Sequence, residues 1–459
     1  MGHLTRQSAV ARALGDRADV VVLSLSSGLA VVLEQGLRGE YLPSYQRPWM
    51  PRSDWHRYLA DRVVALAQEL GAEVVAFDGV APYRGLVLAR RRLPGTAFVW
   101  FRRGLWRPGA NRAALRAEPF FDLVVEPGDL AEEADRGATT HRPAHRVPPV
   151  SLLDVLEPLP RDEAARALGL DPEQRTALVT LGSGALGHDE DAVAAAVTAL
   201  REDSGPAWQV ATTQGALHHG DAGEQHVHVL RGVYPLVAYV RAFDLVVSAA
   251  GYNAVHEFVA AGVPTVLVPN PVTATDDQVA RARYLDARGL AVACDATEGP
   301  GGVVRAVRSL LDPQLRAELA AATERCGFGG AQAAAELLLS VTPTAPGPAV
   351  RARRARYLAR ATVVDAVLRL LGEGLADRLR TWRRSGRPGL VRRLPVTVVT
   401  DAAAAPAPGT RPVLVTEALD RELLRREDPL EHVLPGTSDR YLHERLRIAG
   451  QAYDVRARA

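Results

Sequence analysis

Residues 243–295 read FDLVVSAAGYNAVHEFVAAGVPTVLVPNPVTATDDQVARARYLDARGLAVACD, and this stretch indicates the fold of the chain. Its apolar runs and breaks follow the order strand, glycine turn, helix, strand, polar loop, helix, strand. The first run, 244–248, is short and continuously apolar at its centre, which favours a strand buried on both faces of a parallel sheet. Strands that alternate with helices in this way predict an α/β fold with a doubly wound sheet.

The turn after this first strand suits a phosphate. Ala249–Ala250–Gly251 carries little bulk, so backbone N–H groups can come close to an anion. A helix is predicted over Asn253–Ala261, and its unpaired N–H groups and positive dipole end favour negative charge. Glu257 lies one turn into this helix, where its carboxylate can accept hydrogen bonds from two ribose hydroxyls. Ligands of open α/β sheets bind outside the carboxyl ends of the strands, so we expect a sugar-nucleotide site here.

These residues resemble the donor-binding half of GT-B glycosyltransferases, the group of the peptidoglycan N-acetylglucosaminyltransferase and the UDP-glycosyltransferases. The family pattern is a glycine, a polar phosphate contact and a ribose-binding glutamate six residues after the glycine. Gly251, Asn253 and Glu257 match this spacing. A later acidic–glutamine pair, matched by Asp277 and Gln278, binds the donor sugar in the family. The resemblance implies a GT-B fold, in which two Rossmann-like domains face a cleft.

Two positions depart from the family pattern. The family often has a histidine or arginine two residues before the glycine, where this chain has Ala249. A hydroxyl residue three positions after the glycine is replaced by Ala254. We therefore expect helix N–H groups and Asn253 to carry more of the phosphate charge. The alternative is a chance spacing with a solvated glutamate, but the order of the surrounding elements favours the sugar-nucleotide site.

The first residues resemble a second GT-B feature, the glycine–histidine turn that joins the first strand to the first helix. GHLTR, residues 2–6, looks like the end of this turn, and a helix is predicted over Gln7–Leu14. The resemblance implies that His3 faces the cleft and acts as a base, a role that suits a neutral imidazole. A histidine without a role, near a chain start, is the alternative. The strand that the family places before this turn is absent from the sequence, so we expect the first sheet to lack it.

Two further candidates follow predicted strands. Asp78 comes directly after a strand predicted over Glu73–Phe77, where a carboxylate could act as a base or orient an acceptor. A helix cap is the alternative role for Asp78. Arg102 and Arg103 follow a strand predicted over Ala97–Phe101, and guanidinium groups bind phosphate or carboxylate. We expect them to bind an acidic acceptor, or else to form a solvated basic loop.

The second domain begins with a strand predicted over Thr176–Leu181. Gly182–Ser183–Gly184 follows it at once, where the GT-B resemblance implies contact with the diphosphate. Gly232 and Val233 lie where the family holds the nucleobase through backbone hydrogen bonds, which suit uracil. UDP is therefore the expected nucleotide, although main-chain contacts leave the base open.

The domain limits follow from these elements. Residues 1–150 are predicted as a Rossmann-like acceptor domain and 151–341 as a Rossmann-like donor domain. Residues 342–349, TPTAPGPA, are predicted as a linker. Residues 350–459 are predicted as an extension of unknown fold that begins with an Arg-rich helix over 350–371. This helix is expected to cross back to the first domain, and its basic face could contact an anionic membrane surface.

Composition narrows the class of protein. The chain has 459 residues, enough for two or three domains, and its net charge of +2 argues against a nucleic-acid-binding surface. All 55 basic residues are arginine, which indicates codon bias in a GC-rich bacterium.

Cys294 and Cys326 lack metal-ligand spacing and are expected to be buried thiols. The histidines around 218–228 lack the spacing of a metal site. No apolar run is long enough to span a membrane, so we expect a cytoplasmic protein, with possible contact at the inner membrane face.

The sequence leaves three functions open. The first is an inverting, metal-independent glycosyltransferase without a cofactor, which moves a hexose or N-acetylhexosamine from a UDP-sugar co-substrate to an unknown acceptor hydroxyl. The second keeps the fold but makes the protein a sugar-nucleotide hydrolase or epimerase. The third is a non-catalytic subunit that only binds a sugar nucleotide.

Overall fold

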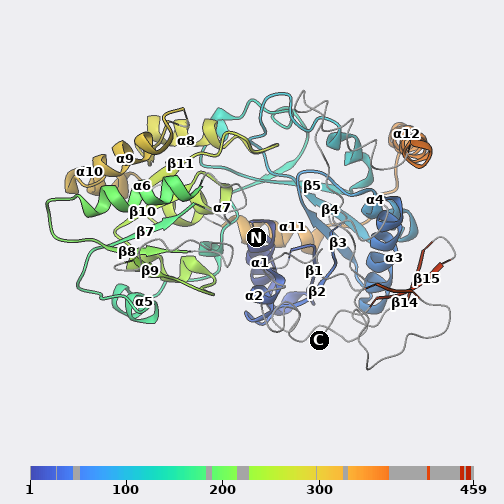
Figure 1. Cartoon of the computed structure of the whole chain (residues 1–459). Coiled ribbons are helices and arrows are strands. Elements are labelled where there is room, and N and C mark those ends of the chain that lie inside the picture. The colour runs from blue at the N-terminus through green and yellow to red at the C-terminus, as the bar shows by residue number, and fades with distance from the viewer. Residues whose placement is uncertain are drawn as a thin grey trace.

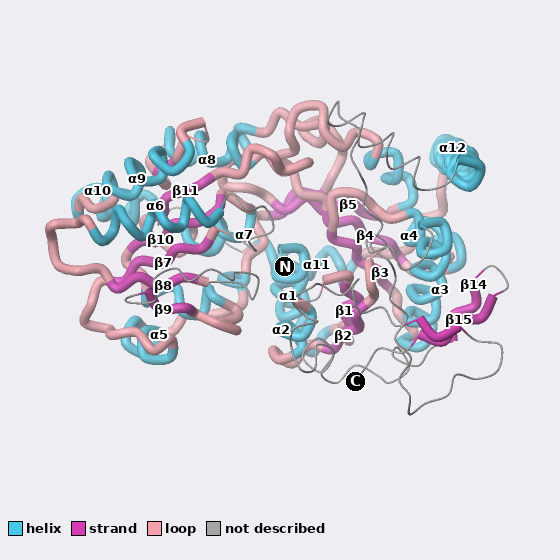
Figure 2. The backbone as a smooth tube through the Cα atoms, viewed as in Figure 1, coloured by secondary structure: helices cyan, strands magenta, loops and turns pink. Residues whose placement is uncertain are grey.

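The computed structural model describes residues 2–26, 28–44, 52–181, 189–213, 227–295, 297–323, 329–371, 411–413, 445–448 and 451–455. The chain forms two halves, each built on a parallel sheet with helices packed against it (Figures 1 and 2). The first helix, α1 (Gly2–Leu14), lies between the two halves (Figure 1). None of the helices among the described residues combines the length and the apolar character that a membrane crossing requires.

The sheet of the C-terminal half has six strands in the order β12-β11-β10-β7-β8-β9, and all its neighbours run parallel. These strands are β7 (Thr176–Thr180), β8 (Gln209–Thr212), β9 (Val227–Val229), β10 (Leu245–Ala249), β11 (Thr265–Val268) and β12 (Val292–Ala293).

Both faces of this sheet are covered. Val247 packs under α6 (Asp189–Arg201) and α9 (Gly299–Ser309), whereas its neighbour Val246 packs on the other face, near η5 (Leu236–Ala242). Successive side chains of a strand point to opposite faces, so a strand in this position must be apolar throughout. The expectation of a doubly buried strand over 244–248 is confirmed.

The strand order reverses between β7 and β10. The chain proceeds from β7 outward to β9, then returns to the other side of β7 and continues through β10 to β12. The loops that follow two such strands run in opposite directions from the carboxyl ends of the strands. The crevice between these loops is where ligands bind in this class of sheet. The turn around Gly251 leaves β10 at this point.

The N-terminal half contains two separate parallel sheets. The larger has the order β3-β4-β5-β6, and the smaller consists of β1 and β2. These strands are β1 (Val21–Ser24), β2 (Arg38–Tyr41), β3 (Val74–Asp78), β4 (Ala97–Phe101), β5 (Leu123–Pro127) and β6 (His145–Val147). Every residue of β4 is buried, but most residues of β1 and β3 are only half-buried. Within the described ranges β1 and β3 do not pair with each other.

Helices on the two faces of the larger sheet complete the N-terminal half. Phe98 and Trp100 pack against α3 (Arg52–Leu70) and α4 (Arg84–Arg92). On the other face, Val99 and Phe101 share an apolar cluster with α1 and α11 (Gly330–Ser340). This cluster also contains residues of the C-terminal sheet, so one core joins the two halves.

The end of the described chain returns to the N-terminal half, as expected for the Arg-rich helix. α12 (Pro348–Leu371) places Tyr357 edge-on to Phe120, with ring centroids 5.2 Å apart. Phe120 lies in η2 (Ala114–Phe120) of the N-terminal half, and Figure 1 shows α12 at the edge farthest from α6. Beyond α12, the short strands β13 (Arg411–Val413), β14 (Arg445–Ile448) and β15 (Gln451–Val455) form a three-stranded sheet.

Candidate active site

Glu257 lies in the middle of a π-helical turn. This turn, η6 (Val255–Val259), continues α7 (Tyr252–Ala254), whereas the sequence predicts one regular helix over 253–261. Single π-turns inside helices are frequent at functional sites. Glu257 is half-buried, and burial alone raises its pKa to about 8. No described residue forms a hydrogen bond or ion pair with its carboxylate, so a ligand that brings hydroxyl donors would relieve this cost.

Gly251 and the predicted sugar-binding pair lie close together. A Cβ atom on Gly251 would lie 3.9 Å from Nε2 of Gln278, whose Oε1 accepts a 3.0 Å hydrogen bond from the Asn270 N–H. The Asp277 carboxylate caps α8 (Gln278–Ala287) by accepting a 3.0 Å hydrogen bond from the Ala280 N–H. Asp277 and Gln278 both line a pocket of about 340 Å³. Their backbone partners hold both side chains at this pocket.

His3 and Asp78 meet on the side of the N-terminal half that faces Asn253 of the other half. His3 Nδ1 lies 2.6 Å from Asp78 Oδ1, although α1 and the end of β3 supply them separately. The Asp78 side chain is 3% exposed and that of His3 is 49% exposed. Burial would raise the pKa of Asp78, but Arg6 and His3 together hold it well below its usual range. Asp78 is therefore an anion at neutral pH.

The protonation of His3 follows from the same contacts. Burial lowers the pKa of His3, and the hydrogen bond to Asp78 opposes this shift only in part. The imidazole is therefore neutral near pH 7, and its Nδ1 lies within hydrogen-bond distance of both the anionic Asp78 Oδ1, at 2.6 Å, and Arg6 Nη2, at 2.9 Å. When Nδ1–H donates to Asp78, Nε2 is left as a proton acceptor, which is the state that a general base needs.

Arg6 is a site residue that the sequence analysis missed. Its Nη2 donates to Asp78 Oδ1 at 2.6 Å and its Nε donates to Asp78 Oδ2 at 3.1 Å. Arg6 is three residues after His3 on the same helix, a spacing that places both side chains on one face. That spacing was a usable signal, but nothing in the sequence connected it to Asp78.

The same helix contacts the predicted phosphate-binding turn of the other half. Arg6 Nη1 donates to Asn253 Oδ1 at 3.5 Å, and the Asn253 Nδ2 donates to the Gly2 carbonyl at 3.2 Å. The Arg6 guanidinium also lies over the Tyr252 ring, 5.0 Å from its centroid. The predicted base and the predicted phosphate contact thus lie on opposite sides of one small interface.

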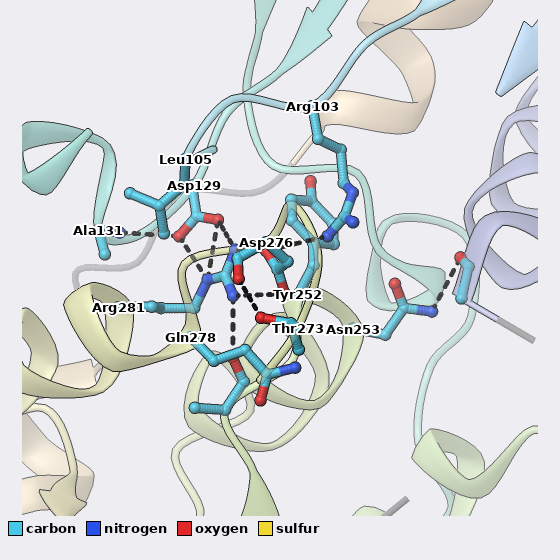
Figure 3. Close-up of polar contacts among 12 residues, drawn as sticks. Arg103, Leu105, Asp129, Ala131, Tyr252, Asn253, Thr273, Asp276, Gln278 and Arg281 are labelled. Atoms are coloured by element: carbon cyan, nitrogen blue, oxygen red, sulfur yellow. Dashed lines mark hydrogen bonds and ion pairs between the residues drawn. The ribbon is translucent and has the colours of Figure 1, made fainter. Parts of the chain in front are cut away.

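A buried arginine holds the loop after β11 in place. Arg281 is fully buried, and its Nη2 donates to Asp129 at 2.9 Å and to Asp276 at 2.8 Å. Its Nη1 donates to the Ala250 carbonyl at 2.8 Å. Figure 3 shows the guanidinium between the two carboxylates. Asp129 belongs to the N-terminal half, so this network fixes the halves relative to each other beside the Gly251 turn.

Backbone contacts at the same place join the two halves further. Residues 105–107 run beside 275–277: the Asp277 N–H donates to the Leu105 carbonyl at 2.9 Å, and Trp106 bridges Asp276. The Arg107 N–H donates to the Thr275 carbonyl at 2.7 Å. The loop that carries the predicted sugar-binding pair is therefore shaped by both halves.

Arg102 has a different environment from the one predicted. It is fully buried, and its guanidinium forms ion pairs with Glu118 and, at 3.1 Å, with Glu126. Because the Arg102 side chain is fully buried and paired with these two glutamates, it has no exposed surface that an acceptor could contact. We therefore assign Arg102 a structural role in place of the predicted acceptor contact.

Arg103 lies on the donor side of the interface. Its Nη1 is 3.6 Å from Asp276, and its guanidinium lies 5.4 Å from the centroid of the Tyr252 ring (Figure 3). Burial lowers the pKa of Arg103, and Asp276 opposes this shift. Its Nε has no hydrogen-bond partner among the described residues. Arg103 therefore lies beside Tyr252, the residue directly after Gly251, and this position suits a contact with the donor better than one with the acceptor.

His256 next to Glu257 is a buried structural residue. Its Nδ1 donates to the Tyr252 carbonyl at 2.6 Å, and its Nε2 accepts a 3.1 Å hydrogen bond from the Leu130 N–H. Burial is the main reason why the pKa of His256 is lowered to about 4. A neutral ring with both nitrogens satisfied serves here to join the halves.

The remaining candidates are described only in part. Gly232 has a left-handed backbone, with φ of 67°, and Val233 beside it is half-buried, both after β9. Gly182, Ser183 and Gly184 lie outside the described residues, as do 218, 219 and 226 of the histidine cluster. Within the described ranges, no group of three or more His, Cys, Asp or Glu side chains is placed to hold a metal ion.

The chain is similar to known glycosyltransferases over most of its length. Residues 195–337 match the glycosyltransferase family 28 C-terminal domain. A UDP-N-acetylglucosamine--N-acetylmuramyl-(pentapeptide) pyrophosphoryl-undecaprenol N-acetylglucosamine transferase from Clavibacter michiganensis is 30% identical over 76% of this chain and 96% of its own. The enzyme of the same name from Mycobacterium leprae is 27% identical over 71% of this chain and 83% of its own.

Solved structures give the same fold. Acinetobacter baumannii MurG superposes with a TM-score of 0.50 at 18% identity, over 74% of this chain and 96% of its own. A Listeria monocytogenes protein described as a UDP-N-acetylglucosamine 2-epimerase superposes with a TM-score of 0.51 at 16% identity, over 72% of this chain and 90% of its own. At these identities the likeness shows the fold alone, whereas the relatives at the sequence level show the family. The chain therefore belongs to glycosyltransferase family 28, and it is a nucleotide-sugar glycosyltransferase of the GT-B fold.

Proposed function

We propose that this enzyme transfers N-acetylglucosamine from UDP to a hydroxyl of a lipid-linked, pyrophosphoryl-bearing acceptor, with inversion at the sugar carbon. The observation that carries the proposal is the position of His3 and Asp78 against the Gly251 turn, through Arg6 and Asn253. Residues 1–150 would then bind the acceptor, and 151–341 would bind the donor.

The donor site is proposed on one face of the C-terminal half. Glu257 would bind the ribose, because its carboxylate is buried without a partner among the described residues. The N–H groups at the start of α7, with Asn253, would bind the diphosphate. The remaining proposed contacts are Gly182, Ser183, Gly184 and Gly251 for the diphosphate, Gly232 and Val233 for the base, and Asp277 and Gln278 for the sugar.

The reaction needs a base on one side of the sugar and stabilisation of the leaving group on the other. His3 Nε2 would take the proton of the acceptor hydroxyl, whose oxygen then bonds to the anomeric carbon. The bond from this carbon to the diphosphate breaks, and the nucleoside diphosphate leaves with the negative charge. Helix N–H groups and the nearby Arg103 would stabilise that charge, so no metal is required in this scheme.

The donor and the acceptor in this proposal come from the relatives. The names of the enzymes from Clavibacter michiganensis and Mycobacterium leprae state a UDP-N-acetylglucosamine donor and a pyrophosphoryl-undecaprenol-linked acceptor. The alignment with the first covers 76% of this chain and 96% of that enzyme, so it extends over both halves of the chain. A lipid-linked acceptor would require the enzyme to work at a membrane surface, on the cytoplasmic side where sugar nucleotides are made.

Thermal unfolding with nucleotides tests the donor site. We expect UDP and UDP-N-acetylglucosamine to raise the Tm of the wild type and of Glu173→Ala, a control at an exposed glutamate outside the site. At about a hundred times Kd, the ligand should stabilise the protein by roughly 2.7 kcal/mol. The shift should vanish in Glu257→Ala. A folded wild-type protein that responds to no nucleotide would contradict the donor site.

Product analysis separates transfer from the other two functions. We expect UDP release from UDP-N-acetylglucosamine to depend on an added lipid-linked acceptor and to persist with a metal chelator. Release of free sugar at the same rate without acceptor would identify a hydrolase instead. Nucleotide binding without any turnover would identify a binding subunit.

A further inference from the structure

A second cavity lies on the N-terminal half, apart from the pocket lined by Asp277 and Gln278. It has a volume of about 920 Å³ and lies between η2, the segment 137–142 and α12. Figure 1 shows α12 and α4 at the edge of the molecule opposite to the C-terminal sheet, so this cavity is separate from the Gly251 turn. Six arginines line the cavity: Arg112, Arg116, Arg142, Arg353, Arg356 and Arg360.

The positive charge of this cavity is not balanced by the residues around it. No aspartate or glutamate lines it. Arg142 is paired with Glu118, but the same carboxylate also pairs with the buried Arg102. The guanidinium groups of the other five lining arginines form no hydrogen bond or ion pair with any described residue. Like charges gathered in one concave surface attract anions strongly, because the low-dielectric walls focus the field.

α12 holds its arginines in a defined position. Arg354 donates to the Pro119 carbonyl at 2.6 Å, and Tyr357 packs on Phe120. Arg353, Arg356 and Arg360 fall at helical spacings around Tyr357, so one helix face presents them toward η2. Because α12 is already folded and packed, a ligand has to order only its exposed side chains and not its backbone. Arg353, Arg356 and Arg360 are exposed, and they share one concave surface with the exposed Arg112 and Arg116.

We propose that this cavity binds a phosphate-bearing ligand with at least two negative charges, at a site distinct from the donor site. Guanidinium groups bind phosphate oxygens through paired hydrogen bonds and remain charged at any physiological pH. The volume suits a small phosphorylated molecule or the headgroup of a phospholipid. Leu115 and Tyr357 supply an apolar wall for the organic part of such a ligand.

Binding of inorganic pyrophosphate and of lipid vesicles by the full chain tests this site. The test variant is Arg353→Ala with Arg356→Ala. The control variant is Arg91→Ala with Arg201→Ala, which removes the same charge from exposed arginines outside the cavity. Titration calorimetry measures pyrophosphate, and co-sedimentation compares vesicles of phosphatidylglycerol with vesicles of phosphatidylcholine.

The outcomes separate the two sources of phosphate. We expect saturable binding of pyrophosphate, of phosphatidylglycerol vesicles or of both, weakened roughly tenfold or more in the test variant and unchanged in the control. Pyrophosphate binding alone would indicate a soluble ligand, and vesicle binding alone a lipid headgroup. Equal weakening in both variants, or no binding of either probe by the wild type, would overturn the proposal.

Discussion

His3 and Asp78, 75 residues apart in the chain, are joined by a 2.6 Å contact between Nδ1 and Oδ1. The aspartate is buried and anionic, whereas the histidine is half-exposed and neutral near pH 7. An anion beside Nδ1 favours a proton on that nitrogen, and it stabilises the imidazolium that forms when Nε2 accepts a proton. This pair is the strongest reason to place the base on α1.

We expect His3→Ala to lower kcat by about two to four orders of magnitude while the Kd of UDP stays the same, because a base acts only in the reaction step. Single-turnover kinetics and calorimetric titration of UDP measure the two quantities. Gln7→Ala is a suitable control, since Gln7 contacts the same carboxylate from the same helix but carries no base. An unchanged kcat in His3→Ala would exclude His3 as the base.

Asp78→Asn should lower kcat and shift its pH dependence. The active form of His3 is neutral, so kcat rises with pH through the pKa of His3. Asp78 raises that pKa, so its removal should move the acidic limb of the profile to lower pH. The exposed Asp16 offers a control as Asp16→Asn. An acidic limb that stays in place would show that another group titrates.

Glu257→Gln should stabilise the ligand-free protein in alkaline solution. The folded-state pKa of about 8 lies above the usual value of 4.5, so the contribution of Glu257 to stability is complete below pH 4.5 and is lost as the pH rises through 8. The neutral glutamine escapes this loss. We expect the free energy of unfolding in urea to favour the variant by on the order of 2 kcal/mol at pH 8.5, after allowance for partial exposure, and by little near pH 4. Equal stability of variant and wild type at pH 8.5 would contradict the buried, unpaired state of this carboxylate.

Arg281→Met should destabilise the protein by about 3–5 kcal/mol, because it leaves the buried Asp129 without its cation and removes the closer of the two arginines that pair with Asp276. Urea unfolding measures the change. Arg288→Met is the matched control: its pair with Glu133 is exposed on both sides and should contribute about 0–1 kcal/mol. Similar small losses in both variants would mean that Arg281 does not hold the halves together.

Substitutions of Arg102 and of Arg103 should affect different properties, namely stability for Arg102 and donor binding for Arg103. Arg102→Met should cost about 3 kcal/mol of unfolding free energy, since Glu126 loses its buried partner, and should leave the KM of the acceptor unchanged. Arg103→Met should weaken UDP-sugar binding roughly tenfold with a smaller loss of stability. Unfolding curves and steady-state kinetics on both variants measure this. A raised acceptor KM in Arg102→Met, in a fully folded sample, would restore the acceptor role predicted from the sequence.

Local patterns predicted the elements of this fold well. The runs at 97–101 and 176–181, rich in apolar and β-branched residues, became β4 and β7, because such runs suit strands that are buried on both faces of a parallel sheet. The spacing of Gly251 and Glu257 likewise depends on one turn and one helix, although the π-helical turn under Glu257 left no sequence signal. Such a turn depends on tertiary packing rather than on residue type.

Contacts between distant segments could not be predicted in this way. Arg102 and Arg103 are adjacent and chemically identical in the sequence, yet one is buried between two glutamates and the other faces the Gly251 turn. Alternation along a backbone sends neighbouring side chains in opposite directions, and only the surrounding fold decides which direction meets an acid. The contact of Arg6 with the Asp78 carboxylate likewise depends on the fold, because the two residues are 72 positions apart in the chain.

The separation of the β1–β2 pair from the larger sheet bears on how firmly α1 is held. A two-stranded pair has only marginal stability by itself, and among the described residues β1 and β3 each leave one edge without a strand partner. Amide hydrogens in β1 and β2 should therefore exchange with solvent much faster than those of the fully buried β4. Helix α1 carries His3 and packs against α11, and its Leu4 shares an apolar cluster with Tyr41 of β2, so local opening of the pair would loosen the base. Activity would then fade on warming before the molecule as a whole unfolds.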